Sequence, residues 1–171
     1  ALLVAENAAY IGEVHILDIG LHKDFYTSVH SPCELVDDSI IHSICKPRRR
    51  FAHKGNFGHA LLVAGSYGKI GAAVLSARAC LRSGTGLVTC HIPKCGYDIL
   101  QTSVPEAMVT TDFNSSFITK IELDLSMYDA VGIGPGIGTA SETKMMLREI
   151  LDTYRSPLVL DADALNIMAS Q

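Results

Sequence analysis

The sequence predicts an α/β domain built on a mostly parallel sheet that carries helices on both faces. Short apolar runs of strand length alternate with helix-length patterns, and glycine-containing turns join them. The strand-length runs are almost continuously apolar, as expected when both faces of a parallel sheet are buried. Ligands bind such sheets beyond the carboxyl ends of the strands, so the residues that directly follow strands are the candidates for function.

The predicted elements follow one another from residue 59 onward. Strands are predicted at 59–64, 87–92, 107–111, 130–134 and 158–161, where apolar runs end at glycine, proline or a polar residue. Helices are predicted at 71–83, 96–103, 115–124, 141–154 and 162–169. The helical pattern is strongest over 141–154, where apolar residues recur on one face.

The amino-terminal part has a different character. Residues 13–19 are interpreted as a strand that ends at Gly20, and residues 21–47 as a linker with a short helix near 36–44. The first residues lack an initiator Met and the basic region of a secretory signal, so we expect the chain to begin inside a longer protein.

Composition excludes several classes of protein. The 171 residues are 48% hydrophobic and 19% charged, which is too apolar for a disordered chain and sufficient for one domain with a sizeable core. The net charge of −4 argues against a nucleic-acid partner, and no apolar run approaches the roughly 20 residues of a membrane span. Five cysteines form no CxxC and seven histidines no HExxH or HxH, so we predict reduced thiols, a cytoplasmic protein and no metal site.

The first candidate cluster is GSYGKIGAA at 65–73, between a predicted strand and a predicted helix. Glycines permit positive φ and close ligand approach, and a helix start offers unpaired N–H groups to an anion. The order matches neither a Walker A loop nor a strict GxGxxG fingerprint. A ligand-binding turn and a plain strand-to-helix turn are therefore both open.

The second cluster is GIGPGIG at 132–138. Four glycines at alternate positions, with Pro135 among them, exceed what one turn requires. This pattern favours bare main chain that contacts a ligand over a tight connection alone.

The third cluster is DADALN at 161–166, after the last predicted strand. Two carboxylates separated by alanine could hold Mg²⁺ or accept hydrogen bonds from ligand hydroxyls. Alternatively, Asp163 could cap the next helix. We favour the functional interpretation.

Other polar residues receive weaker interpretations. The basic stretch at 46–50 is taken as a solvated linker end or a phosphate contact, rather than a nucleic-acid patch. Lys54, before the first strand, and Glu106, after Pro105, are structural or peripheral candidates, and Asn56 is assigned no role.

Taken in order, four segments resemble the first half of the NAD(P)H-hydrate dehydratase domain, a branch of the ribokinase-like superfamily. They are HKGNFGHALLVAGSYGKIGAAVLSARACLRSGTGLVTCHIP, VPEAMV, YDAVGIGPGIG and LVLDADALN. Residues 5–20 are similar to the last strand of an NAD(P)H-hydrate epimerase domain. The implied organisation is the end of an epimerase-type domain at 1–20, a linker at 21–47 and the amino-terminal part of a ribokinase-like dehydratase domain at 48–171.

The resemblance implies an enzyme that dehydrates the (S)-epimer of NADHX or NADPHX, the hydrates of NADH and NADPH. Phosphoryl transfer from ADP, or from ATP, would turn the hydroxyl into a good leaving group, with Mg²⁺ on the phosphates. The resemblance also implies a homo-oligomer and an epimerase partner domain that uses K⁺.

Eight residues are implied as substrate contacts: Gly71, Ala72, Gly134, Gly136, Gly138, Asp161, Asp163 and Asn166. The catalytic residue is unknown and expected beyond Gln171, because no GxGD-type segment follows Asn166.

Two alternatives remain. A ribokinase-like small-molecule kinase, such as a vitamin-precursor kinase, would share the fold and the glycine turns, although the KGxxG opening together with GPGIG and DADALN favours the dehydratase. An inactive fragment or binding module is the alternative of another class, because half of a sheet exposes an unpaired edge.

Overall fold

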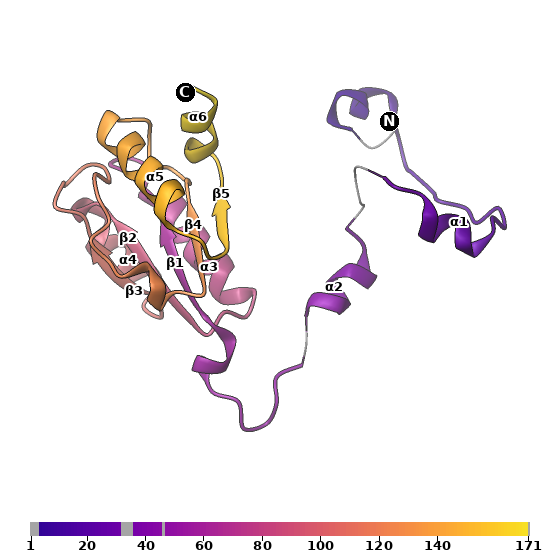
Figure 1. The fold of residues 1–171 in the computed structure, drawn as a ribbon, viewed down its shortest axis with the longest axis horizontal. Helices are drawn as coiled ribbons and strands as arrows, with labels where there is room; N and C mark the ends of the chain where they lie inside the picture. The colour runs from indigo at the N-terminus through magenta and orange to yellow at the C-terminus, as the bar shows by residue number, and fades with distance from the viewer. Residues whose placement is uncertain (1–3, 32–35, 46, 171) are drawn as a thin grey trace. The chain divides into compact units, whose positions relative to one another are not determined.

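The computed structural model describes residues 4–31, 36–45 and 47–170. Contacts between residues divide the chain into two compact units, Ala1–Pro47 and Arg48–Gln171 (Figure 1). Cys33 and Lys46, which belong to the predicted cysteine set and basic stretch, lie outside the described residues. The four cysteines inside them, Cys45, Cys80, Cys90 and Cys95, are free thiols as predicted.

The first unit contains three short helices and no strand among its described residues. These are a 3₁₀ helix η1 (Ala5–Tyr10), α1 (Lys23–Ser28) and α2 (Asp38–Ile44). The helix predicted near 36–44 is confirmed as α2, whose N-cap Asp37 accepts a hydrogen bond from the backbone N–H of Ile40 at 3.0 Å. Helix α1 was not predicted.

The strand predicted at 13–19 is wrong. Residues 11–22 form neither helix nor strand, and the side chains of Val14, Ile16, Leu17 and Ile19 are 42 to 80% exposed. A strand requires a neighbour with which to exchange backbone hydrogen bonds, and the described residues of this unit offer none.

The second unit is built on a five-stranded, entirely parallel sheet in the order β3-β2-β1-β4-β5. The strands are β1 (His59–Val63), β2 (Leu87–Ile92), β3 (Met108–Thr111), β4 (Ala130–Ile133) and β5 (Leu158–Leu160). In the central strand, Leu61 lies opposite Thr89 on one side and Val131 on the other. All five predicted strands are therefore confirmed, with ends shifted by no more than one residue.

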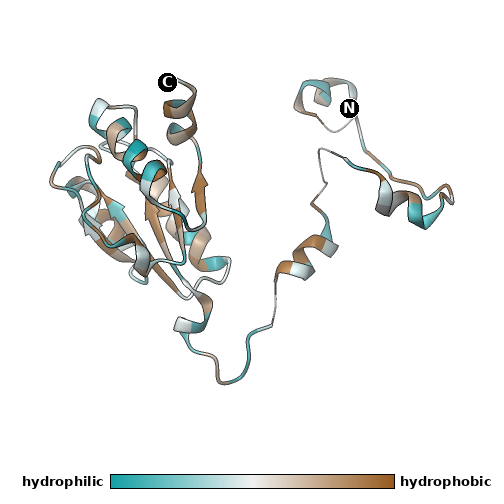
Figure 2. Ribbon diagram, in the orientation of Figure 1, coloured by the Kyte–Doolittle hydropathy of each residue, from teal (hydrophilic) through white to brown (hydrophobic). Residues whose placement is uncertain are grey.

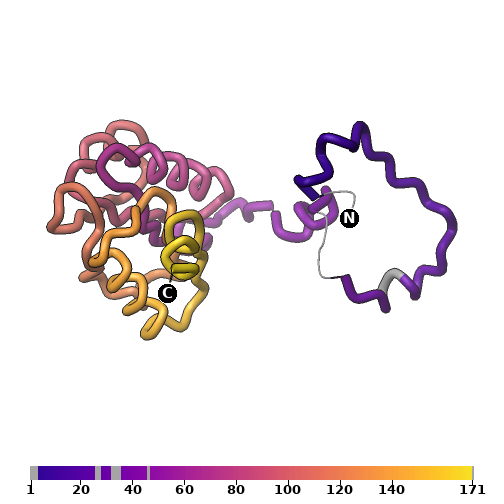
Figure 3. The backbone as a smooth tube through the Cα atoms, turned by 90° about the horizontal axis from the view of Figure 1, so that it is seen from above, coloured from indigo at the N-terminus to yellow at the C-terminus, as the bar shows by residue number. Residues whose placement is uncertain are grey.

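Helices cover both faces of this sheet, as predicted. They are α3 (Ile70–Arg82), α4 (Tyr97–Ser103), α5 (Ser141–Thr153) and α6 (Asp163–Ala169), with short 3₁₀ turns η2 (Lys54–Phe57), η3 (Lys94–Gly96) and η4 (Leu125–Met127). Seen from above, α3 and α5 lie on opposite sides of the sheet (Figure 3). The strands between them are predominantly hydrophobic (Figure 2).

Two buried clusters correspond to the two faces. One joins the sheet to α3 and α4 through Ala64, Ala73, Ala77, Val88, Cys90, Ile92, Leu100, Val104 and Ala107. The other joins it to α5 and α6 through Leu61, Val63, Ile118, Val131, Ile133, Ile137, Met146, Leu147, Ile150, Ala164 and Ile167. In β1, Leu61 and Val63 enter the second cluster and Leu62 packs against the first, which explains its continuously apolar sequence.

The helix predicted at 115–124 is also wrong, because side chains in this segment bind the backbone amides. The buried carboxylate of Asp112 accepts from the N–H groups of Asn114, Thr119 and Lys120 at 2.6 to 3.0 Å. The side chain of Asn114 accepts from the N–H of Ser116 at 2.8 Å. Such local bonds compete with the helical hydrogen-bond pattern and stabilise a loop instead.

The strand order creates a topological switch point between β1 and β4. The chain leaves β1 for β2 by way of α3, and leaves β4 for β5 by way of α5 on the other face. The connections therefore diverge at the carboxyl ends of these two neighbouring strands, which is where open α/β sheets bind ligands. In Figure 1 β5 runs up toward α6, which marks the carboxyl end of the sheet.

Within the described ranges, no helix is both long enough and apolar enough to cross a membrane.

Candidate functional site

Two glycine-containing loops meet at the switch point. The backbone N–H of Gly65, after β1, donates to the carbonyl oxygen of Pro135, after β4, at 2.8 Å. The hydroxyl of Ser66 donates to the carbonyl oxygen of Gly136 at 2.7 Å, and Ser66 is only 9% exposed. The two loops are 70 residues apart in sequence, yet these bonds make them one surface.

The start of α3 forms one wall of this surface. A Cβ atom at Gly136 would lie 3.0 Å from the Cβ of Ala72 and 3.1 Å from the carbonyl oxygen of Lys69. Gly71 lies beside Ala72 in the first helical turn and is exposed. This turn carries the positive end of the helix dipole, and the N–H of Ala72 within it donates to the carbonyl oxygen of Lys69 at 3.1 Å. The structure thus brings Gly71, Ala72 and Gly136 together at a position suited to an anionic group.

The three predicted glycines of the second loop serve different structural purposes. Gly134 has φ +138°, and a Cβ there would lie 1.8 Å from the carbonyl oxygen of Asp161, so the close approach of two backbones requires glycine. Gly138 has φ +76° and would meet nothing within 4 Å. Of the three, Gly138 is therefore the one that faces open space.

Asp163 connects this loop to α3 and α6. Its Oδ2 atom accepts from the backbone N–H of Gly138 at 2.9 Å and lies 3.5 Å from Nζ of Lys69, while Oδ1 accepts from Nδ2 of Asn166 at 3.4 Å. The Gly138 hydrogen bond, with smaller help from Lys69 and Asn166, lowers the pKa of Asp163. The side chain does not cap α6, because the N-cap is Ala162 and no side chain caps the helix. Asp163 instead fixes the position of the glycine loop.

The turn before α6 holds an unusual backbone conformation. Ala162 has φ 46° and ψ −115°, and it is the only residue other than glycine with positive φ among the described residues. This conformation places the exposed side chain of Asp161 and the inward side chain of Asp163 on either side of a strained residue. Strain of this kind is often held at functional sites.

A family model described as NAD(P)H-hydrate dehydratase matches residues 60–171, which span the sheet, both glycine loops and the turn at Asp161. The chain belongs to the NAD(P)H-hydrate dehydratase family.

Two curated relatives illustrate the family. The bifunctional NAD(P)H-hydrate repair enzyme of Vibrio cholerae is 32% identical over 98% of this chain and 33% of its own length. The ADP-dependent (S)-NAD(P)H-hydrate dehydratase of Streptococcus thermophilus is 36% identical over 80% of this chain and 49% of its own length. The chain thus spans between a third and a half of these relatives.

Solved structures agree with the fold. The ADP/ATP-dependent NAD(P)H-hydrate dehydratase of Bacillus subtilis, co-crystallised with ATP and Mg²⁺, superposes with a TM-score of 0.63 at 28% identity, over 75% of this chain and 46% of that one. A ribokinase-like superfamily protein of Enterococcus faecalis gives a TM-score of 0.66 at 23% identity, over 82% of this chain and 51% of that one. The predicted ribokinase-like α/β fold is therefore confirmed.

All eight residues expected to contact substrate in this dehydratase-family chain lie at the carboxyl end of the sheet or in the first turns of the helices there. Lys54 and Glu106 do not. Lys54 begins η2 before β1, and Glu106 lies in the turn before β3. Because every strand is parallel, residues that precede strands lie at the opposite end from the switch point.

Sequence reasoning assigned no role to Ser66 or Lys69, although both lie inside the first glycine cluster. Ser66 bonds to the second loop, and Lys69 is the cation nearest to Asp163. Both residues directly follow a central strand, and this position could have marked them as candidates, because ligands bind beyond the carboxyl ends of strands at a switch point.

The described residues do not assemble a complete metal site. No group of three or more His, Cys, Asp or Glu side chains comes together among them. The Asp163 carboxylate is already engaged by an N–H group and an ammonium, which leaves Asp161 as the free oxygen ligand of the pair. The described residues therefore do not fit a Mg²⁺ site of their own.

An apolar cavity of about 330 Å³ adjoins the switch point. Its lining residues come from β1, α3, β4 and β5 and include Leu62, Cys80, Gly132 and Val159, with Pro135 and Asp161 also lining it. The cavity lies on the α3 side of the sheet, because Leu62 and Cys80 pack against the α3 cluster. Asp161 is thus shared between this cavity and the turn that holds Asp163.

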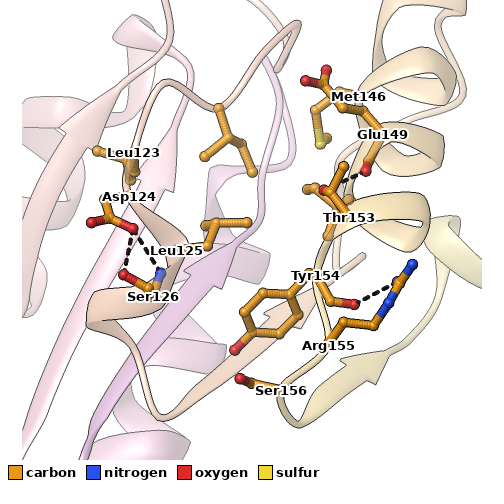
Figure 4. Close-up of a pocket in the computed structure, with 12 residues that line it drawn as sticks. Leu123, Asp124, Leu125, Ser126, Met146, Glu149, Thr153, Tyr154, Arg155 and Ser156 are labelled. Carbon is orange, nitrogen blue, oxygen red and sulfur yellow. Dashed lines mark hydrogen bonds between the residues drawn. The ribbon is translucent and has the colours of Figure 1, made fainter.

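A second cavity, of about 440 Å³, lies between α5 and the segment that leads from β3 to β4 (Figure 4). In Figure 4 Leu123 and Leu125 face Met146 and Tyr154 across the space. Its polar groups mostly serve local bonds: Asp124 accepts from the N–H and hydroxyl of Ser126, and Arg155 donates to backbone carbonyls. Because Ser126 and Ser156 precede β4 and β5, this cavity is at the amino end of the sheet, away from the switch point.

Proposed function

We propose that this chain forms the substrate-binding half of an enzyme that dehydrates the (S)-epimer of NAD(P)H hydrate at the expense of ADP or ATP. The meeting of the two glycine loops supports the proposal most directly. The Ser66 hydroxyl donates to the Gly136 carbonyl, and the Gly138 N–H donates to the Asp163 carboxylate. This arrangement leaves main chain and an exposed carboxylate, Asp161, at one rim. Such a rim suits a ligand with a ring, a hydroxyl and an anionic linkage.

The reaction has two steps. In the first, the hydroxyl oxygen of the hydrate attacks the terminal phosphorus of the nucleotide, the hydroxyl proton is removed, and AMP leaves from ADP or ADP leaves from ATP. In the second, the carbon–oxygen bond breaks, inorganic phosphate departs with the bonding pair, and the adjacent carbon loses a proton to restore the double bond. Phosphate leaves far more readily than hydroxide, so the nucleotide drives the elimination.

Each part of the site has a role in this proposal. The first turn of α3, with Gly71 and Ala72, faces the anionic linkage of the substrate. In the loop after β4, Gly138 lets the damaged ring approach bare main chain, while Gly134 and Gly136 permit the close backbone contacts that shape the loop. In the third cluster, Asp161 accepts a hydrogen bond from a substrate hydroxyl, while Asp163 and Asn166 hold the loop. We assign no catalytic base within this chain and expect it beyond Gln171, together with the residues that hold the nucleotide and its Mg²⁺.

We also propose that residues 1–20 belong to an epimerase-type domain, joined through 21–47 to the dehydratase part at 48–171. The bifunctional enzyme of Vibrio cholerae aligns with 98% of this chain, whereas the dehydratase of Streptococcus thermophilus aligns with 80%. An epimerase partner that uses K⁺ would let both hydrate epimers be repaired. A cytoplasmic homo-oligomer completes this proposal.

The decisive experiment supplies the intact protein with NADPH hydrate and either ADP or ATP. Recovery of the near-ultraviolet absorbance of the reduced nicotinamide ring, dependent on the nucleotide, would support the proposal. A reaction without nucleotide is the control for spontaneous dehydration. If the protein phosphorylates a vitamin alcohol and leaves the hydrate unchanged, it is a small-molecule kinase and the proposal is wrong.

A further inference from the structure

An aromatic ring and a lysine lie together at the carboxyl ends of β2 and β3, beside the switch point. Phe113 follows β3 and its side chain is 75% exposed, and Lys94 follows β2 and is also exposed. Nζ of Lys94 is 6.0 Å from the centroid of the Phe113 ring. None of the ion pairs among the described residues involves Lys94, so its charge is not matched by a carboxylate.

This pair belongs to the same surface as the glycine loops. The backbone N–H of Lys94 donates to the carbonyl oxygen of Asn114 at 3.2 Å, and that of Cys95 to Ser115 at 3.1 Å. The N–H of Tyr67, in the first glycine loop, donates to the carbonyl oxygen of Ser116 at 2.6 Å. The segment 114–116 therefore bridges the loops that follow β1 and β2.

A buried carboxylate holds the bridging segment in place. Asp112 is 3% exposed and accepts from the backbone N–H groups of Asn114, Thr119 and Lys120, and from the hydroxyl of Thr119. Phe113 follows Asp112 directly, so the backbone that carries the exposed ring is fixed. A fixed backbone on each side lowers the conformational freedom that binding would have to remove.

We propose that Phe113 and Lys94 form the subsite for the adenosine end of the substrate, with the Phe113 ring against the purine and Lys94 on the 2′-phosphate of hydrated NADPH. This inference rests on the proposed function and adds the basis for discrimination between the two hydrates. The 2′-phosphate is carried by the same ribose as the purine, so a cation held over the ring, 6.0 Å from its centroid, matches it. β3 lies two strand spacings, about 10 Å, from β1, so an extended dinucleotide with its linkage at α3 can reach both places.

Binding of two matched probes tests the lysine directly. We expect the intact protein to bind 2′-phospho-ADP-ribose roughly tenfold more tightly than ADP-ribose in calorimetry, as one charged hydrogen bond allows. Lys94→Ala should remove this preference, and Lys120→Ala should keep it, because Lys120 is an exposed lysine that pairs with Glu122. Equal binding of the two probes by the unchanged protein, or a preference that survives in Lys94→Ala, would overturn the proposal.

Kinetics test the ring. Phe113→Ala should raise KM for both hydrates by roughly fivefold or more, as expected for loss of stacking on one base, with kcat unchanged. Phe113→Tyr should retain the KM because it keeps a ring. If the enzyme restores NADH and NADPH but Phe113→Ala leaves KM unchanged, the subsite is wrong and the proposed function stands. If neither coenzyme is restored by the intact protein, the proposed function itself fails.

Discussion

Oδ2 of Asp163 lies 2.9 Å from the backbone nitrogen of Gly138, across a separation of 25 residues. This single bond joins the start of α6 to the loop after β4, and Lys69 at 3.5 Å extends the link to the start of α3. Three elements that converge on the switch point are thus connected through one carboxylate. The same bond explains why Gly138, the most open of the three glycines after β4, keeps a defined position.

Replacement of Asp163 should therefore change substrate binding more than it changes the free energy of unfolding. Asp163→Ala leaves the Gly138 N–H without its acceptor, and we expect a loss of about 1–2 kcal/mol in the free energy of unfolding with a KM for the hydrate raised roughly tenfold. Asp163→Asn keeps an acceptor oxygen and should lose less. Urea unfolding and initial rates measure both, and Asp152→Ala, at an exposed carboxylate of α5, is the control. An unchanged KM in Asp163→Ala would refute the assigned role.

Alanine at Gly134 should be far more damaging than alanine at Gly68. At Gly134 the new Cβ would lie 1.8 Å from the carbonyl oxygen of Asp161, so β4 and β5 would have to separate. We expect a loss of more than about 3 kcal/mol in the free energy of unfolding. Gly68 also has positive φ, at +80°, but would meet nothing within 4 Å, so Gly68→Ala should cost about 1–2 kcal/mol. Similar unfolding midpoints for the two variants would show that the predicted clash does not occur.

The fold could be predicted because the five strands are buried on both faces and their sequences are therefore continuously apolar. The strand predicted at 13–19 failed, because that segment includes Glu13, His15 and Asp18 and the described residues offer it no neighbouring strand. The helix predicted at 115–124 failed because Asp112, outside the predicted helix, determines the conformation of the segment. Both errors concern segments whose local structure depends on partners outside the segment itself.

The clustering of the candidate site residues at one end of the sheet could be predicted for a simple geometric reason. Each glycine cluster directly follows a strand, and parallel strands place all such residues at one end of the sheet. The bonds inside the site could not be predicted, because the contact of Ser66 with Gly136 spans 70 residues. Lys54, taken as a structural or peripheral residue, begins η2 before β1 and so lies at the opposite end of the sheet from the glycine loops.

Stability should fall as the pH falls below neutrality, in part because of His91. His91 is 4% exposed, and its Nδ1 lies 3.0 Å from Oγ1 of Thr110 and its Nε2 3.0 Å from the carbonyl oxygen of Lys120. Burial lowers the pKa of His91 below its ordinary value of 6.5, against smaller opposing effects of the Lys120 carbonyl and Asp112. The folded state then binds a proton less readily than the unfolded state, so stability is complete above pH 6.5 and is lost as the pH falls toward the lower folded pKa.

The variant His91→Gln should flatten this part of the stability profile. Urea unfolding above and below pH 6.5 measures the slope, and His15→Gln, at an exposed histidine of the first unit, should leave it unchanged. Burial also lowers the pKa of His59, so some slope should remain in His91→Gln. A slope equal to that of the unchanged protein would show that His91 takes no part in it.

Ser66 offers the most direct test that the two glycine loops act as one surface. Its hydroxyl is buried and donates to the Gly136 carbonyl, so Ser66→Ala leaves that carbonyl without its donor and should cost about 1 kcal/mol in the free energy of unfolding. If the loops bind substrate together, the KM for the hydrate should rise severalfold. Ser83→Ala removes a hydroxyl that donates to the Cys80 carbonyl at the end of α3, and it should lower stability without any change in KM. The two variants make the same chemical change, one in the loop before α3 and one at its C-cap. A KM that rises equally in both would attribute the effect to general destabilisation, and a rise in Ser66→Ala alone would attribute it to the joined loops.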